Sequence, residues 1–198
     1  MRVTDRLRLR QRHTPDSVRI EIIQELDADD AKLEIPWAGP HPRLRYRDLK
    51  RFPGQIARLP ECRKFPPLKS LLRKINAPSS TLRSAKCEAW STAELAEDER
   101  LDFSLPFKTG SYVDVVFDRA GRPPRLEAHL QLAGKVRTKL RTFRIQGQME
   151  IVIRRCLFHP KKFWGYALTF FVHAYGSTPH QANNEWTRAL KALADALT

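Results

Sequence analysis

Cations and aromatic rings that could bind nucleic acid are concentrated in the segment 135–175. Every second residue at its start is a cation: Lys135, Arg137, Lys139 and Arg141. Such alternation places one class of residue on each face of a β-strand. A row of cations at that spacing can follow a phosphate backbone, and interleaved aromatic rings can stack on bases. The sequence therefore predicts a nucleic-acid-binding protein with a basic sheet face.

The predicted interface extends beyond this strand. Its further members are Arg144, Arg154, Arg155, Lys161, Lys162 and Trp164. A second row of arginines near the N-terminus could be a basic arm that orders on nucleic acid, or an edge strand with one solvated face: Arg6, Arg8 and Arg10. The chain has no aromatic RNP motif and no GxxG loop, so the pattern does not distinguish DNA from RNA.

A metal-dependent nuclease is the alternative hypothesis, because carboxylates clustered around a divalent ion could cleave the bound strand. Asp114 and Asp118 are four residues apart, on or just after one expected strand, and Glu127 and His129 lie in the next. This order loosely resembles the acid and Glu-x-Lys pattern of restriction-type nucleases, with His129 in the place of the lysine. Ordinary polar strand faces produce such arrangements often, so the sequence assigns no catalytic residue, metal ion or cofactor.

Motifs for other chemistry are missing from the sequence. There is no GxSxG nucleophile elbow, no GxxxxGK[ST] phosphate loop and no HExxH zinc motif. Cys156 lies near His159, but its bulky neighbours predict a buried thiol. The other cysteines, Cys62 and Cys87, are distant in sequence and form no CxxC pair, so we expect reduced thiols and a cytoplasmic protein.

The charge balance implies an anionic partner. Thirty-six Lys and Arg against 22 Asp and Glu give a net charge of +14, which favours nucleic acid over a membrane surface. No apolar run approaches the roughly 18 residues of a membrane-spanning helix, and the N-terminus has no signal-peptide core. A third hypothesis is a scaffold that binds an acidic protein partner. The protein could also be a subunit of a larger nucleoprotein complex.

The elements expected to position these residues form an α+β fold. Alternating segments between 81 and 175 predict an antiparallel β-meander. Its expected strands include 101–107, 113–117, 126–132, 135–145, 149–157 and 163–175. Thr178, Pro179 and Gln181 match the start of a helix, which we expect to run over 179–197 and to cover one sheet face.

The N-terminal part is expected to contain a β-hairpin and short helices. Residues 18–35 alternate around an acidic turn and predict the hairpin, although one helix over 18–34 is a competing interpretation. Two short helical pieces are expected within 44–59, and a clearer helix from Pro66 to about Asn76. The predicted organisation is an N-terminal subdomain or extension over 1–78 and a sheet with its helix over 79–198.

Overall fold

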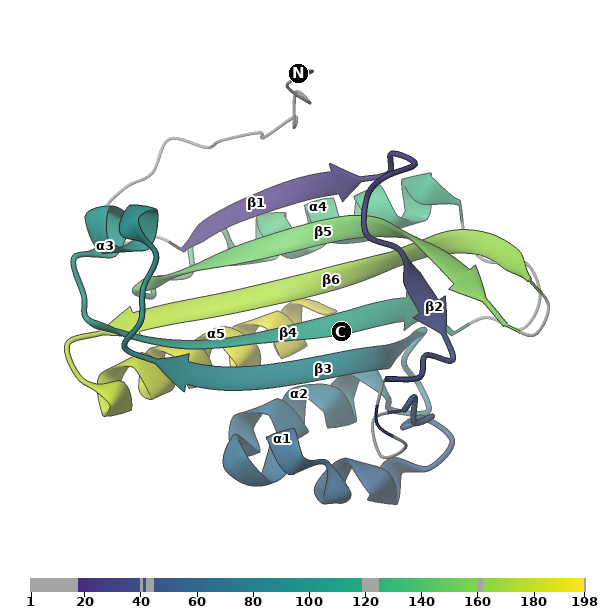
Figure 1. Ribbon diagram of the computed structural model, residues 1–198, viewed down its shortest axis with the longest axis horizontal. Helices are drawn as coiled ribbons and strands as arrows, with labels where there is room; N and C mark the ends of the chain where they lie inside the picture. Colours follow the sequence, from purple (N-terminus) through teal and green to yellow (C-terminus); the bar gives the residue numbers. More distant parts are fainter. Residues whose placement is uncertain (1–17, 40, 42–44, 119–124, 160–161, 198) are drawn as a thin grey trace.

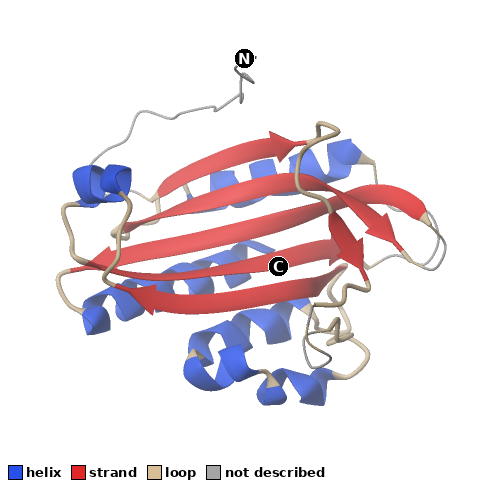
Figure 2. Ribbon diagram, in the orientation of Figure 1, coloured by secondary structure: helices blue, strands red, loops and turns tan. Residues whose placement is uncertain are grey.

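The computed structural model describes residues 18–39, 41, 45–118, 125–159 and 162–197. They form an open, mixed six-strand sheet with helices packed on one face, so the expected α+β class is confirmed (Figures 1 and 2). Five strands lie side by side, and a short sixth strand, β2 (Leu33–Ile35), pairs with β5. In sheet order the five are β1 (Arg19–Glu25), β5 (Gly147–Phe158), β6 (Phe163–Gly176), β4 (Phe107–Phe117) and β3 (Leu82–Thr92).

The centre of the sheet is the long antiparallel pair β5 and β6. Both strands are rich in β-branched and aromatic residues, which favour extended backbone. In β6, Leu168, Phe170 and Val172 are buried on the side covered by helices. The residues between them, Thr169 and Phe171, point to the other side because side chains alternate along a strand. The sheet therefore has one closed face and one open face.

In Figure 1, α4 (Leu126–Leu140) and α5 (Pro179–Leu197) lie behind the sheet, and α1 (Pro60–Lys64) and α2 (Pro66–Ile75) lie along its β3 edge. Residues of these four helices share the core that closes this face. The longest, α5, packs on β6 and β4, as expected for the C-terminal helix. Its N-terminus has the expected capping bonds: the Thr178 hydroxyl accepts the Gln181 amide, and the Gln181 side chain accepts the Ser177 amide. None of the described helices is long and apolar enough to cross a membrane.

The short elements before β3 agree with the expected helical pieces. A 3-10 helix, η1 (Pro53–Arg58), precedes α1, and α2 ends at Ile75, next to the predicted end. Leu68 and Leu72 of α2 belong to the same apolar cluster as Val113 and Val115 of β4. The division of the chain at residue 78 stays a prediction.

The expected N-terminal hairpin is wrong. β1 and β2 do not pair with each other; both run parallel to β5 along the same edge, Ile22 opposite Ile151 and Leu33 opposite Cys156. β5 is 12 residues long, so its outer edge can hold both strands one after the other. Pairing with β5 satisfies their backbone groups at an existing sheet edge, which a two-stranded hairpin in water achieves poorly.

Two expected strands of the meander, 126–132 and 135–145, lie largely in one helix instead, and a third is partly helical. Residues 126–140 form α4, whose buried residues His129, Ala133, Val136 and Leu140 recur at helical spacing. The segment expected as a strand over 101–107 contains the end of a short helix, α3 (Glu97–Phe103). Its first turn holds three acids, which are favourable at a helix N-terminus. The sheet is mixed rather than an antiparallel meander.

We expect Trp186→Phe to lower the free energy of unfolding by about 1–3 kcal/mol, because it removes a buried hydrogen bond and leaves a small cavity. Trp186 is fully buried, donates its indole N–H to Ser111 Oγ at 3.0 Å and meets the Phe65 ring edge-on. Urea denaturation measures the change. Trp164→Phe, at a side chain that is 48% exposed, is the matched control. An equal effect of both substitutions would contradict this account of the core.

Candidate nucleic-acid interface

The predicted row of alternating cations does not exist, because its residues lie on a helix. Residues two apart on a helix point in nearly opposite directions, whereas residues four apart share a side. Lys135 and Lys139 therefore lie on one flank of α4, and Arg137 and Arg141 on the other. The buried stripe of α4, which includes Val136, separates the two flanks. The prediction of a basic face on a sheet strand is wrong for this reason.

The cations of β5 and of the β5–β6 turn lie at three places. Arg154 points to the open face, where its Nε donates to Glu25 Oε2 at 2.7 Å. Arg155 lies against the exposed Trp164, with its guanidinium carbon 4.9 Å from the ring centroid. Lys162 is exposed in the turn. Four predicted contacts, Arg6, Arg8, Arg10 and Lys161, lie outside the described residues.

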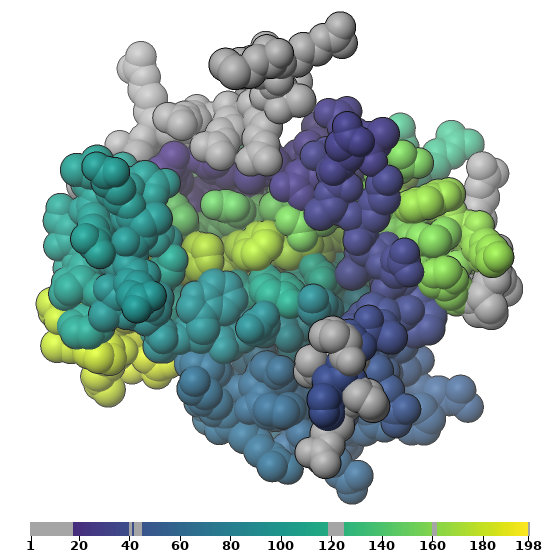
Figure 3. Space-filling view, in the orientation of Figure 1, coloured from purple at the N-terminus to yellow at the C-terminus, as the bar shows by residue number. Residues whose placement is uncertain are grey.

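The open face of the sheet carries nearly balanced charge. Residues paired directly across neighbouring strands share a face, so the register assigns its members. Among the described residues of these strands, the cations on it are Arg19, Arg83, Lys86, Lys108 and Arg154, and the acids are Glu21, Glu25, Glu88, Asp114 and Glu150. A phosphate backbone would meet as many repulsive as attractive charges here. Figure 3 shows this face as a hollow between α3 and the β1–β2 segment.

A hydrogen-bonded aspartate lies at the centre of the open face. Asp114 is 5% exposed, accepts a hydrogen bond from the Thr169 hydroxyl and is opposite Lys86. Burial raises the pKa of Asp114, against the hydrogen bond from Thr169 and the nearby charge of Arg154. Arg154 in turn donates to Thr169 Oγ1 at 3.3 Å. The carboxylate is thus already occupied by protein partners.

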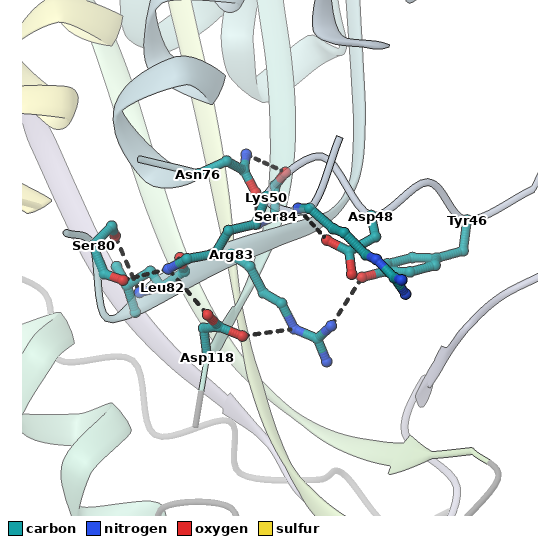
Figure 4. A network of polar contacts seen from close by, with 10 residues as sticks. Tyr46, Asp48, Lys50, Asn76, Ser80, Leu82, Arg83, Ser84 and Asp118 are labelled. Carbon is teal, nitrogen blue, oxygen red and sulfur yellow. Dashed lines mark hydrogen bonds and ion pairs between the residues drawn. The ribbon is translucent and has the colours of Figure 1, made fainter. Parts of the chain in front are cut away.

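The three carboxylates of the nuclease hypothesis are not brought together. Asp118 lies at the end of β4, where it pairs with Lys50 at 3.1 Å and with Arg83 at 3.8 Å (Figure 4). Glu127 is in the first turn of α4, on the opposite side of the sheet from Asp114. Within the described residues, no group of three His, Cys, Asp or Glu could hold a metal ion. The nuclease therefore gains no support from the geometry.

His129 and the cysteines are packing residues. His129 is buried in α4, with Nδ1 3.0 Å from the Arg125 carbonyl and its ring against Phe117 and Tyr166. Burial lowers its pKa. Cys156 is fully buried, as the sequence predicted, and burial raises the pKa of its thiol to about 12. A thiol in that state is a poor nucleophile.

One end of the open face is closed by α3. Glu99 of this helix accepts hydrogen bonds from Lys108 Nζ at 2.6 Å and from the Tyr175 hydroxyl at 2.8 Å, and Phe103 stacks on the Tyr175 ring. Burial alone would raise the pKa of Glu99, but these bonds and the Ala96 amide outweigh it and hold the pKa below its ordinary value. α3 is therefore fixed to the sheet by a partly buried ionic contact.

The strongest excess of cations is on the helix layer. Helices α1, α2, α4 and α5 contain four acids, Glu61, Glu127, Glu185 and Asp195. The same helices contain ten cations, Arg63, Lys64, Lys69, Arg73, Lys74, Lys135, Arg137, Lys139, Arg188 and Lys191. We call the outer side of these four helices, with the loop 141–144, the helical face. Arg141 and Arg144 in that loop are exposed and add to its positive charge.

A groove of about 710 Å³ between α4 and α5 lies within the helical face. Lys139, Arg188 and Lys191 line it, together with Phe143 and Asp195. The Arg188 guanidinium lies over the Phe143 ring and donates to the Arg144 carbonyl at 3.1 Å. These contacts attach the loop after α4 to α5, so that cations from two helices and one loop converge on a single groove.

The sequence analysis missed Arg188 and Lys191. They are three residues apart in α5 and lie off the apolar stripe, so helical spacing alone could have placed them side by side. The sequence pattern does not show that α4 lies next to α5. This arrangement of the two helices makes the two cations part of a shared groove.

Comparisons with known proteins found no relative of this chain. No protein-family model, no curated protein and no solved structure matches this chain. Function is therefore inferred from the fold and its surfaces.

Acid should destabilise the protein partly through His173. Burial, and next the charge of Lys108, lower the pKa of His173 to about 4. A folded-state pKa below the ordinary value of about 6.5 means that His173 favours folding above pH 6.5, and that this contribution is lost as the pH falls towards 4. It amounts to at most about 3 kcal/mol. We expect His173→Phe, which keeps a ring against Trp90, to show a smaller loss of unfolding free energy between pH 6.5 and pH 4.5 than the parent protein. Parallel pH profiles of the two proteins in urea denaturation would show that His173 does not contribute.

Proposed function

We propose that the protein binds nucleic acid through the helical face, with the α4–α5 groove at its centre. The observation that carries the proposal is the distribution of charge: the helical face has a large excess of cations, whereas the open sheet face is balanced. Phosphate contacts from lysine and arginine supply most of the affinity of non-specific nucleic-acid binding. The positive side of the molecule is therefore the side expected to face the nucleic acid.

Five of the residues predicted from the sequence lie on this face, although not as a row. They are Lys135, Arg137, Lys139, Arg141 and Arg144. Lys139 also donates to the Ala196 carbonyl at 3.2 Å, so it stabilises the end of α5 as well as adding charge. Arg141, Arg144 and Lys191 are all exposed, and they are the side chains best placed to contact phosphates.

The proposed contact is mainly with the backbone of the nucleic acid rather than with its bases. Phe143, the ring in the groove, is partly buried and already carries Arg188 on its face, which leaves it poorly placed for base stacking. Binding should then tolerate many sequences and weaken steeply with salt. The turn with Arg155, Lys162 and Trp164 offers a second, smaller contact in which an exposed ring could stack on a base.

The triple substitution Arg141→Glu, Arg144→Glu and Lys191→Glu tests the proposal. We expect it to weaken the binding of labelled single- and double-stranded DNA and RNA by at least about tenfold at low salt. If three phosphate contacts are lost, the slope of log affinity against log salt should also become shallower by about 2 to 3. Fluorescence anisotropy titrations at several salt concentrations measure both quantities.

The control must change the net charge by the same amount elsewhere. Lys32→Glu, Arg45→Glu and Arg100→Glu reverse three exposed cations, two in the segments on either side of β2 and one in α3, none of them in the four helices or the loop of the helical face. This variant should keep most of the affinity and the salt slope. Equal losses in both variants would mean that net charge, not the helical face, determines binding. Failure of the parent protein to bind any of the four probes at low salt would overturn the proposal and favour an acidic protein as the partner of the basic surface.

A further inference from the structure

A second hollow lies at the β3 edge of the open face, where Glu61 of α1 also lines it, and it has the opposite charge preference. It has a volume of about 570 Å³ and lies between the segment that contains β2 and the strands β3 and β4. Glu34, Glu61 and Glu88 line it, against Lys32 and Lys86. The chain has a net charge of +14, so charges placed at random would line a hollow with more cations than acids. A hollow with more acids than cations is therefore unexpected. This asymmetry suggests that the hollow receives positive charge.

A β-bulge builds the hollow. The pairing of β3 with β4 shifts by one residue between Ser84 and Lys86. Ser84 faces the helices, where it bonds Asn76, whereas Ala85 belongs to the apolar cluster of the open face and Lys86 is opposite Asp114 on that same face. The extra residue therefore turns Lys86 to the open side. Bulges of this kind redirect side chains and are common beside functional sites.

The same bulge also holds one wall of the hollow. The carbonyl of Ala85 accepts a hydrogen bond from the indole N–H of Trp37 at 2.8 Å. On the other side, Tyr112 of β4 presents its ring and is directly opposite Glu88 of β3 in the strand register. Trp37 is thus fixed by a hydrogen bond to the strand that carries Lys86, and Tyr112 is held beside that strand by the pairing of β3 with β4.

The Lys86 ammonium lies over both of these rings. It is 5.5 Å from the centroid of Trp37 and 5.7 Å from that of Tyr112, both within the range of cation–π attraction. We call the two rings and the ammonium position that contacts both of them the aromatic box. The protein has filled the box with its own cation, whose long and flexible side chain can leave it by rotation about single bonds.

We propose that the aromatic box binds a small organic cation with a quaternary ammonium group, and that Lys86 occupies the box when this ligand is absent. Aromatic rings and nearby carboxylates recognise such groups through cation–π and charge attraction. The volume of the hollow is in the range of small-molecule sites. The inference is independent of the proposed nucleic-acid binding, because the box and the helical face lie on opposite sides of the sheet.

Competition from Lys86 makes a specific prediction. The apparent affinity of the box is reduced by the fraction of molecules in which Lys86 occupies it. Removing the ammonium should therefore improve the binding of an external cation, whereas most substitutions in a binding site weaken it. Lys86→Ala empties the box, and Lys86→Met removes the charge while keeping an apolar stem of similar length.

The probes are choline and 3,3-dimethylbutan-1-ol, a neutral molecule of nearly the same shape. Each is titrated into the ¹⁵N-labelled full chain at constant ionic strength, and the indole N–H signals are followed by NMR. Trp37→Phe identifies the Trp37 signal among the four tryptophans. We expect both Lys86 variants to bind choline at least about tenfold more tightly than the parent protein, with the shift at Trp37. The neutral probe should bind at least about tenfold more weakly than choline.

Lys32→Ala is the matched control, because it removes a lysine from the rim of the same hollow but not from the box. It should behave like the parent protein. The proposal fails if either Lys86 variant gives the spectrum of a folded protein and choline leaves the Trp37 signal in place. It also fails if choline and the neutral probe bind equally, since the hollow would then be only an apolar surface.

Discussion

The burial of α5 against β6 and β4 is the contact on which both surfaces of the protein depend. Trp186, Leu190 and Leu193 are at most 1% exposed, and each such side chain contributes about 1.5–3 kcal/mol by leaving water. Because strand side chains alternate, seating Phe170 under this helix turns Phe171 to the opposite side. The position of one helix thus determines which face of the sheet stays open and where the outer surface of the helices lies.

The two surfaces differ in how their charges are compensated. On the open face, cations are partnered within the protein: Arg154 pairs with Glu25, and Lys108 with Glu99. A phosphate could recruit these side chains only by breaking partly buried ion pairs, which is costly. On the helical face the acids are too few to pair with all the cations. Solvated cations of that kind release counterions on binding a polyanion, which is why we propose this face, and not the open face, for nucleic-acid binding.

The sequence correctly predicted those elements whose residue pattern fits only one type of secondary structure. The helix at 179–197 has capping residues and one apolar stripe, and both are present. Residues 126–140 satisfy two periods at once: Leu126, Leu130 and Leu132 alternate, while His129, Val136 and Leu140 repeat at helical spacing. Gly134 favours a turn in a strand pattern, but inside a helix a single glycine costs only about 0.5–1 kcal/mol relative to alanine and so does not prevent the helix. Only packing against α5 and β6 selects the helix, and packing across the chain cannot be read from a local pattern.

The aromatic box shows a second limit of the same kind. Trp37, Lys86 and Tyr112 are far apart in sequence, and no spacing rule relates them. Their meeting depends on a one-residue shift between β3 and β4, which leaves no mark in the composition of either strand. The net charge is also a weak predictor of binding sites, because +14 is a sum over surfaces of different charge. It reflects the cations of the helical face and conceals a hollow that is lined by three carboxylates and in which one cation contacts two rings.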